Sequence, residues 1–389
     1  MRYRKLGRSD CQVSILGFGC MRLPILEGAE TAMSFSERQK AIDEEKAIEM
    51  IDYAVEQGIN YFDSAYPYHG GKSEVVLGKA MENRREKVVL ATKSPPRMIE
   101  TRDDFDRIID EQLERLGTDY LDFYLLHGLA RQSWYKTKEL GALDFLDKIQ
   151  KDGRAKYVGF SFHDDVRIFR EIIDAYDWTI CQIQYNFIDE NYQAGKEGLR
   201  YASSKGIGVV IMEPLRGGRL TDKIPMEVQR IWDLTKHQRT PAEWGLRWVW
   251  NHPEVSLVLS GMSTMAQLKE NIRIAEKAAP HSMSPEEIET IHKVADAYRR
   301  LLKVDCTGCA YCMPCPNSVN IPIIFSLYND YYMFQNLERC RMMYNVLMPP
   351  EQKASNCEEC GECEEKCPQE IKIIETLKEV HDLLYQQSM

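Results

Sequence analysis

The stretch that decides the fold is INYFDSAYPY, residues 59–68. An apolar run there ends at Asp63, and Tyr68 follows five residues later across a short loop that contains a proline. We interpret the run as a buried parallel strand that carries a carboxylate at its C-terminal end. Two further strands end in the same way, VVLATK at Lys93 and YLDFYLLH at His127. Three successive strands with ionisable groups at the same end predict a (β/α)8 TIM barrel, because active sites form at that end of the barrel.

The first 280 residues repeat the alternation of apolar strand and amphipathic helix. A short hairpin, RYRKLG and CQVSILGFG, is expected to cover the bottom of the barrel and lead into its first strand. Counting through the chain gives eight βα units, the last four strands lying near residues 157–161, 179–184, 208–212 and 256–260. No G-x-G-x-x-G follows the first strand, which argues against an open dinucleotide-binding sheet. The polar segment from Glu27 to Asp43 is expected to be a mobile loop.

These patterns predict an α/β chain of two domains. The barrel occupies residues 1–283, and a helix at 284–304, which opens with Ser284-Pro285-Glu286-Glu287, forms its last element and the linker. Residues 305–389 form a small, mostly helical second domain.

Composition narrows the class of partner and the cellular compartment. The chain has 389 residues, of which 44% are hydrophobic and 28% charged, and a formal net charge of −10. An acidic chain without clustered Lys and Arg is not expected to bind nucleic acid. No secretory signal and no run of about 18 apolar residues is visible, so we predict a cytoplasmic protein without a membrane partner.

The twelve cysteines are unevenly distributed, with nine of them between Cys306 and Cys367. In a reducing cytosol such clustering indicates metal binding rather than disulfides. Two runs, CTGCAYCMPCP and CEECGECEEKCP, supply eight candidate ligands: Cys306, Cys309, Cys312, Cys315, Cys357, Cys360, Cys363 and Cys367. Cys340, between the runs, is expected to be an ordinary buried thiol.

The second run has the C-x2-C-x2-C-x3-C-P spacing of bacterial ferredoxins, in which the fourth cysteine ligates the other cluster. By that rule Cys306, Cys309, Cys312 and Cys367 hold one [4Fe-4S] cluster, and Cys315, Cys357, Cys360 and Cys363 hold a second. The first run has two residues where three are usual before its last cysteine, which leaves the exchange of ligands and the second cluster open. Structural zinc on paired C-x2-C motifs is the alternative.

Asp63, Tyr68, Lys93 and His127 are the candidate catalytic residues. A free phenol has a pKa near ~10, and a neighbouring ammonium favours its ionised form. A carboxylate can hold that ammonium in place, and an imidazole can orient a carbonyl oxygen. Such a set is suited to protonating a carbonyl while hydride arrives at its carbon.

The motifs D-S-A-Y-P-Y, A-T-K and L-L-H resemble those of the aldo-keto reductase superfamily over roughly residues 1–300. The tail is similar to a helical dicluster ferredoxin, and the two halves together resemble bacterial aldo-keto reductases with a C-terminal ferredoxin-like extension.

The resemblance implies that NADP(H) or NAD(H) lies extended across the barrel mouth. It assigns Gly19, Cys20 and Met21 to the border of the nicotinamide, and Ser161 and Gln182 to its carboxamide. It assigns Met212, Pro214, Leu215 and Gly217 to the pyrophosphate, and Ser263, Gln267, Glu270 and Asn271 to the adenosine end.

Several positions depart from the family pattern. Phe162 stands where an asparagine is usual, and Met212 stands where an aromatic ring is expected to stack on the nicotinamide. No Lys or Arg lies between Gly261 and Leu268 to meet a 2′-phosphate; Lys269, Arg273 and Arg216 are the nearest candidates. The choice between NADPH and NADH is therefore open.

The function predicted from these features is reduction of a small aldehyde or ketone with NAD(P)H. Hydride carries two electrons, a cluster carries one, and no flavin motif is visible. The clusters are therefore expected to be structural, to serve an external redox partner, or to need a flavin or a radical-forming substrate. A non-catalytic, nicotinamide-binding redox or iron-sulfur sensor is the alternative. Trp134 and Tyr135, expected on the loop after the fourth strand, either line the substrate pocket or pack on the barrel rim.

Overall fold

The computed structural model describes residues 1–29, 37, 41–306, 308–309 and 311–386. The chain divides into two compact units. The first comprises Met1–Gly218 and Arg239–Ser284, and the second comprises Arg219–Gln238 and Pro285–Met389.

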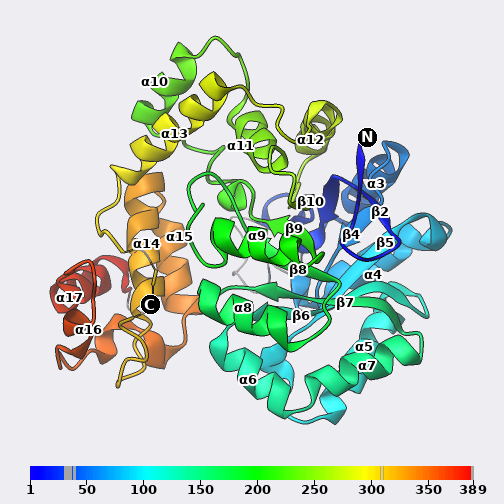
Figure 1. The fold of residues 1–389 in the computed structure, drawn as a ribbon, viewed down its shortest axis with the longest axis horizontal. Coiled ribbons are helices and arrows are strands. Elements are labelled where there is room, and N and C mark those ends of the chain that lie inside the picture. Colours follow the sequence, from blue (N-terminus) through cyan, green and yellow to red (C-terminus); the bar gives the residue numbers. More distant parts are fainter. Residues whose placement is uncertain (30–36, 38–40, 307, 310, 387–389) are drawn as a thin grey trace. The chain divides into compact units, whose positions relative to one another are not determined.

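The first unit is a closed barrel of eight parallel strands, as predicted (Figure 1). In chain order the strands are β3 (Leu16–Gly19), β4 (Tyr61–Asp63), β5 (Val89–Ser94), β6 (Leu121–Leu129), β7 (Ala155–Phe162), β8 (Ile180–Gln184), β9 (Gly208–Met212) and β10 (Val255–Ser260). The ring closes where β10 pairs with β3, with Val258 opposite Leu16. Almost every strand residue is buried, because side chains fill the interior and helices cover the outside.

A hairpin of β1 (Tyr3–Lys5) and β2 (Gln12–Ser14) precedes the barrel, also as predicted. Leu6 and Val13 from this hairpin pack with Tyr61, Phe123 and Leu257 in one apolar cluster. The hairpin therefore closes the end of the barrel opposite the carboxyl ends of the strands.

The barrel unit also contains helices that surround the strands in sequence. They are α3 (Glu44–Glu56), α4 (Lys72–Met81), α5 (Asp103–Leu116), α6 (Arg131–Glu139), α7 (Ala142–Lys151), α8 (Val166–Ala175), α9 (Gly195–Ser204), α11 (Pro241–Trp250) and α12 (Met265–Lys277). The expected mobile loop from Glu27 to Asp43 falls largely outside the described residues. None of the helices in the described part of the chain is both long and apolar enough to cross a membrane.

The second unit is mostly helical. It contains α10 (Met226–Leu234), α13 (Pro285–Arg299), α14 (Ile321–Phe334), α15 (Leu337–Met342), α16 (Glu362–Glu365) and α17 (Ile373–Leu384). Its core gathers Phe325, Tyr328, Tyr344 and Val380, with several cysteines packed against it. Helix α10 lies in an insertion that leaves the barrel after β9 and returns before α11, and this insertion belongs to the second unit together with α13.

Candidate active site and iron-sulfur centre

The barrel brings together the four side chains that the sequence singles out. Asp63, Lys93 and His127 lie on the neighbouring strands β4, β5 and β6, and Tyr68 begins the short turn Tyr68–Gly71 after β4. The Lys93 ammonium donates to Asp63 Oδ1 at 2.5 Å and to the Ser64 carbonyl at 2.6 Å. Its Nζ lies 5.2 Å from the centroid of the Tyr68 ring. The rings of Tyr68 and His127 meet edge to face, with their centroids 5.6 Å apart.

Burial divides the four residues into an inner and an outer pair. Lys93 and Asp63 are buried, whereas Tyr68 and His127 are half-buried and face the barrel mouth. Burial alone lowers the pKa of Lys93, but the charge and hydrogen bond of the Asp63 carboxylate oppose it, and the net shift is upward. Lys93 is therefore a permanent cation beneath the phenol.

Tyr68 and His127 are both uncharged at neutral pH. Burial raises the pKa of Tyr68, and the opposing effect of Lys93 reduces this shift without reversing it. Burial, with the nearby Lys93, His163 and Arg97, lowers the pKa of His127 to about 3. The site thus presents a protonated phenol and a neutral imidazole, which suits donation of a proton and of a hydrogen bond to a carbonyl oxygen.

The residues assigned to the nicotinamide lie at the ends of β3, β7 and β8. Gly19 ends β3, Cys20 is fully buried, and Met21 is 56% exposed. Ser161 and Gln182 are register partners on β7 and β8. Gln182 Oε1 is buried and accepts no hydrogen bond from the described residues. An unsatisfied buried oxygen beside a serine fits a carboxamide that would supply the missing donor.

The residues assigned to the pyrophosphate lie beyond β9, the seventh strand of the barrel. Met212 ends that strand, and Pro214, Leu215 and Gly217 follow it. In TIM barrels the loops after the seventh and eighth strands frequently form a phosphate site.

Arg22 lies at these two loops, although the sequence analysis did not single it out. A Cβ added to Gly217 would lie 2.8 Å from Arg22 Nη2, and one added to Gly261 would lie 3.0 Å from Arg22 Cδ. The two glycines therefore leave room for the Arg22 side chain, with its guanidinium beside Gly217 and its aliphatic part beside Gly261. Arg216 is buried, and its Nε is 3.3 Å from Asp189 Oδ2. The only sequence signal for Arg22 is its place three residues after a strand end.

The residues assigned to the adenosine end surround the start of α12. Ser263 Oγ donates to the Arg22 carbonyl at 3.0 Å, and Gln267 Oε1 accepts from the Ser263 amide at 2.9 Å. Glu270 accepts from Thr240 Oγ1 at 2.7 Å, and the buried Asn271 donates to Ser260 Oγ at 3.0 Å. Ser263, Gln267 and Asn271 therefore hold the end of β10 and its loop in shape, whereas Glu270 connects α12 to Thr240 at the start of α11.

The expectation that Trp134 and Tyr135 lie on a loop is wrong, since both are on helix α6. Trp134 is fully buried and donates through Nε1 to Glu171 at 3.1 Å, and the Tyr135 hydroxyl donates to the same carboxylate at 2.9 Å. Both side chains join α6 to α8.

The cysteines of the tail line two hollows. Cys306, Cys309, Cys312 and Cys367 line one of them, together with Ile321 and Phe325. Cys315, Cys357, Cys360 and Cys363 line the other, which Cys312 also borders. Each hollow is therefore lined by cysteines from both runs. Cys340 is buried, as expected.

Among the described residues, no group of three or more His, Cys, Asp or Glu side chains has an arrangement that would hold a single metal ion. The two groups of cysteines are described by the hollows they line.

Comparison with known proteins finds a matching family model for the barrel region and another for the cysteine-rich tail. Residues 31–296 match the model of the aldo/keto reductase family. The chain belongs to this family. Residues 305–374 match a 4Fe-4S dicluster domain, so this aldo/keto reductase carries an iron-sulfur domain at its C-terminal end.

Individual aldo/keto reductase relatives support this assignment. The oxidoreductase YqkF of Bacillus subtilis (strain 168) is 26% identical over 332 residues, which cover 77% of this chain and 99% of that protein. The L-galactose dehydrogenase of Arabidopsis thaliana is 27% identical over 334 residues, 77% of this chain and 95% of the relative. The holo form of aldo-keto reductase AKR11C1 from Bacillus halodurans superposes with a TM-score of 0.63 at 28% identity, covering 76% of this chain and 96% of that one. The chain is thus an oxidoreductase of a family that uses NAD(P)H.

We expect the free energy of unfolding to fall on mild acidification because of His127. Its pKa is about 3 in the folded chain and near the ordinary 6.5 when unfolded, so between these values only the unfolded chain binds the proton. The contribution of neutral His127 to the free energy of unfolding is therefore fully present above about pH 6.5 and is lost as the pH falls toward 3. The free energy of unfolding is measured with urea at pH 7.5 and at pH 5.5. Its decrease between these two pH values should be about 1 kcal/mol smaller in His127→Asn than in the parent. Equal losses in both proteins would contradict a neutral His127.

We expect the ligand exchange to appear in iron content. The triple variant Cys357→Ser/Cys360→Ser/Cys363→Ser, purified without oxygen, should keep a single cluster of about four irons on the first run. Adding Cys367→Ser should abolish this iron, whereas adding Cys315→Ser should leave it. Iron and sulfide analysis of the two quadruple variants checks the assignment, and the opposite result would show that each run holds its own cluster.

Proposed function

We propose that this protein reduces the carbonyl group of a small aldehyde or ketone with a nicotinamide nucleotide bound at the barrel mouth. The observation that carries the proposal is the Lys93 ammonium, held by Asp63 at 2.5 Å and facing the Tyr68 ring at 5.2 Å. Such a buried cation has one evident use beside a phenol, which is to stabilise the phenolate left after proton transfer.

A bound NAD(P)H would supply the hydride that forms the new C–H bond at the carbonyl carbon. Tyr68 gives its hydroxyl proton to the carbonyl oxygen, so that the product is an alcohol and the phenol becomes a phenolate. Lys93 stabilises that phenolate without transferring its own proton, because Asp63 keeps it charged. His127, being neutral, donates a hydrogen bond that orients the carbonyl oxygen toward Tyr68. Solvent then returns the proton to Tyr68.

For nucleotide binding, the proposal uses Ser161 and Gln182 at the carboxamide and Arg22 at the phosphates. The unsatisfied Oε1 of Gln182 and the glycines that border Arg22 support these roles. Ser263, Gln267 and Glu270 carry no positive charge for a 2′-phosphate, and Lys269 and Arg273 are the nearest cations in the sequence. The proposal therefore includes both NADH and NADPH.

For the second unit, we propose two [4Fe-4S] clusters, one in each cysteine-lined hollow. Each exchanges one electron, whereas hydride transfer from a nicotinamide to the carbonyl carbon would move an electron pair, so the clusters serve an external one-electron partner rather than the carbonyl. Thiolate ligation of this kind favours a reducing compartment such as the cytosol.

We expect dithionite, and not NADH or NADPH alone, to bleach the broad visible absorbance of the anaerobic protein. Bleaching by either nucleotide alone would contradict the proposal that the clusters do not take part in carbonyl reduction.

The test of the carbonyl reductase is Tyr68→Phe. Loss of the proton donor should lower kcat for 4-nitrobenzaldehyde with NADH or NADPH by about 10²–10⁴-fold, without weakening nucleotide binding measured by nicotinamide fluorescence. Tyr135→Phe is the matched control, because it removes a tyrosine hydroxyl from α6 and should leave kcat unchanged. Activity in Tyr68→Phe equal to that of the parent would refute the proposal and favour a nicotinamide-binding sensor.

A further inference from the structure

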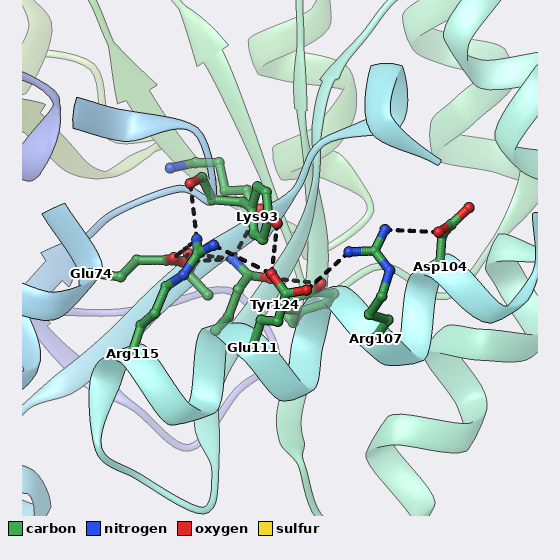
Figure 2. A network of polar contacts seen from close by, with 10 residues as sticks. Glu74, Lys93, Asp104, Arg107, Glu111, Arg115 and Tyr124 are labelled. Atoms are coloured by element: carbon green, nitrogen blue, oxygen red, sulfur yellow. Dashed lines mark hydrogen bonds and ion pairs between the residues drawn. The ribbon is translucent and has the colours of Figure 1, made fainter. Parts of the chain in front are cut away.

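A buried polar network lies on the outer side of the barrel wall, directly behind Lys93 (Figure 2). Thr92 and Lys93 are neighbours on β5, so their side chains point to opposite sides of the strand. Lys93 reaches Asp63 inside the barrel, while Thr92 Oγ1 donates to Glu74 Oε1 on α4 at 2.6 Å. The mechanism proposed above makes no use of this outer layer, although it touches the backbone of the catalytic lysine.

Gln112, fully buried on α5, is the group that reaches that backbone. Its Nε2 lies 3.2 Å from the Lys93 carbonyl, 2.9 Å from Thr92 Oγ1 and 2.7 Å from Glu74 Oε1. Its Oε1 accepts from the Tyr124 hydroxyl at 2.9 Å. Because Tyr124 occupies the oxygen, the amide nitrogen must face β5. Gln112 therefore fixes the strand at the residue that carries the ammonium.

Arg115, one turn further along α5, reaches the loop that carries Tyr68. Its Nη1 lies 3.3 Å from the Tyr66 carbonyl and 3.1 Å from Glu74 Oε2, and its guanidinium carbon lies 4.2 Å from the centroid of the Tyr66 ring. A Cβ added to Gly71 would come within 3.0 Å of the same Nη1. Arg115 thus touches the chain two residues before and three residues after the catalytic phenol.

Glu74 connects Gln112 to Arg115. This carboxylate is fully buried and binds Thr92 and Gln112 through Oε1 and Arg115 through Oε2. A buried ion pair adds little net stability over apolar side chains of the same volume, but removing one partner leaves the other charge buried without compensation. Here that pair connects the strand of Lys93 to the loop of Tyr68.

We propose that Gln112 and Arg115, joined by Glu74, are positioning residues that hold the Tyr68 hydroxyl and the Lys93 ammonium at their working separation. Neither touches a reacting atom, and both act through the backbone of β5 and of the loop at 64–71. The inference rests on the proposed function, in which a phenol gives its proton beside an ammonium. Displacement of a catalytic group by about 1 Å is enough to cost about 10²-fold in rate.

The test uses Arg115→Lys and Gln112→Met in the full-length, anaerobically purified protein. Lysine keeps the charge opposite Glu74 but cannot also bond to Tyr66, and methionine fills the volume of glutamine without its donor. With 4-nitrobenzaldehyde, kcat at 15 °C should fall by about 10- to 100-fold in both, while the nucleotide Kd stays within about twofold of the parent. Thr92→Val, which conserves volume and removes one bond to Glu74, should show a smaller loss of the same kind and provides a variant if either of the others fails to fold.

Arg107 is unsuitable as a control, because Glu111, its partner at 3.0 Å, also accepts from the Tyr66 hydroxyl at 2.7 Å and binds Arg115 at 3.3 Å (Figure 2). Glu114→Gln is the matched control, since Glu114 lies on the same helix and is exposed. Its replacement should leave kcat unchanged.

In the Arg115 and Gln112 variants, the pH above which kcat falls should also move upward, because a more distant Lys93 stabilises the phenolate less.

Two outcomes separate the inference from the proposed function. If Tyr68→Phe is inactive while the folded Arg115, Gln112 and Thr92 variants keep the parental kcat and pH profile, the network is structural only and the inference is overturned. A lower melting temperature with unchanged kcat would lead to the same conclusion. If Tyr68→Phe retains parental activity, the proposed function itself fails, whatever the network variants do.

Discussion

The buried contact between Lys93 and Asp63 is the constraint on which the active site depends. An isolated ammonium in the barrel interior would lose its hydration and tend to lose its proton. The adjacent carboxylate and the Ser64 carbonyl replace that hydration, so the charge persists where it acts on Tyr68. Removing either partner would leave the other buried without compensation, which costs far more than an exposed ion pair contributes.

The closed barrel is what makes this contact achievable. Asp63, Lys93 and His127 are far apart in sequence, yet neighbouring parallel strands deliver all three to one end. Closure of the ring between β10 and β3 similarly places Arg22, from the first strand's loop, beside glycines that follow the seventh and eighth strands. The same architecture therefore positions both the groups proposed for proton transfer and those proposed for nucleotide binding.

The sequence was informative where chemistry and strand ends coincide. The eight-stranded barrel, its family and the clustering of cysteines could be read from apolar runs, from Asp63, Tyr68, Lys93 and His127, and from the C-x2-C spacings. Arg22 and the network of Gln112 and Arg115 could not, because their partners come from other elements and helices carry many such residues on their surfaces. Helix α6 was missed because RQSWYKTKE lacks a regular apolar stripe, so its tertiary contact with Glu171 decides its conformation.

The arrangement of the tail has a consequence for how the protein is made. One cysteine-lined hollow needs Cys367 from the second run, and the other needs Cys315 from the first. With the ligand sets proposed above, both hollows need cysteines at or beyond residue 357, whereas every strand of the barrel precedes residue 261. The barrel strands are therefore translated well before either proposed set of cluster ligands is complete.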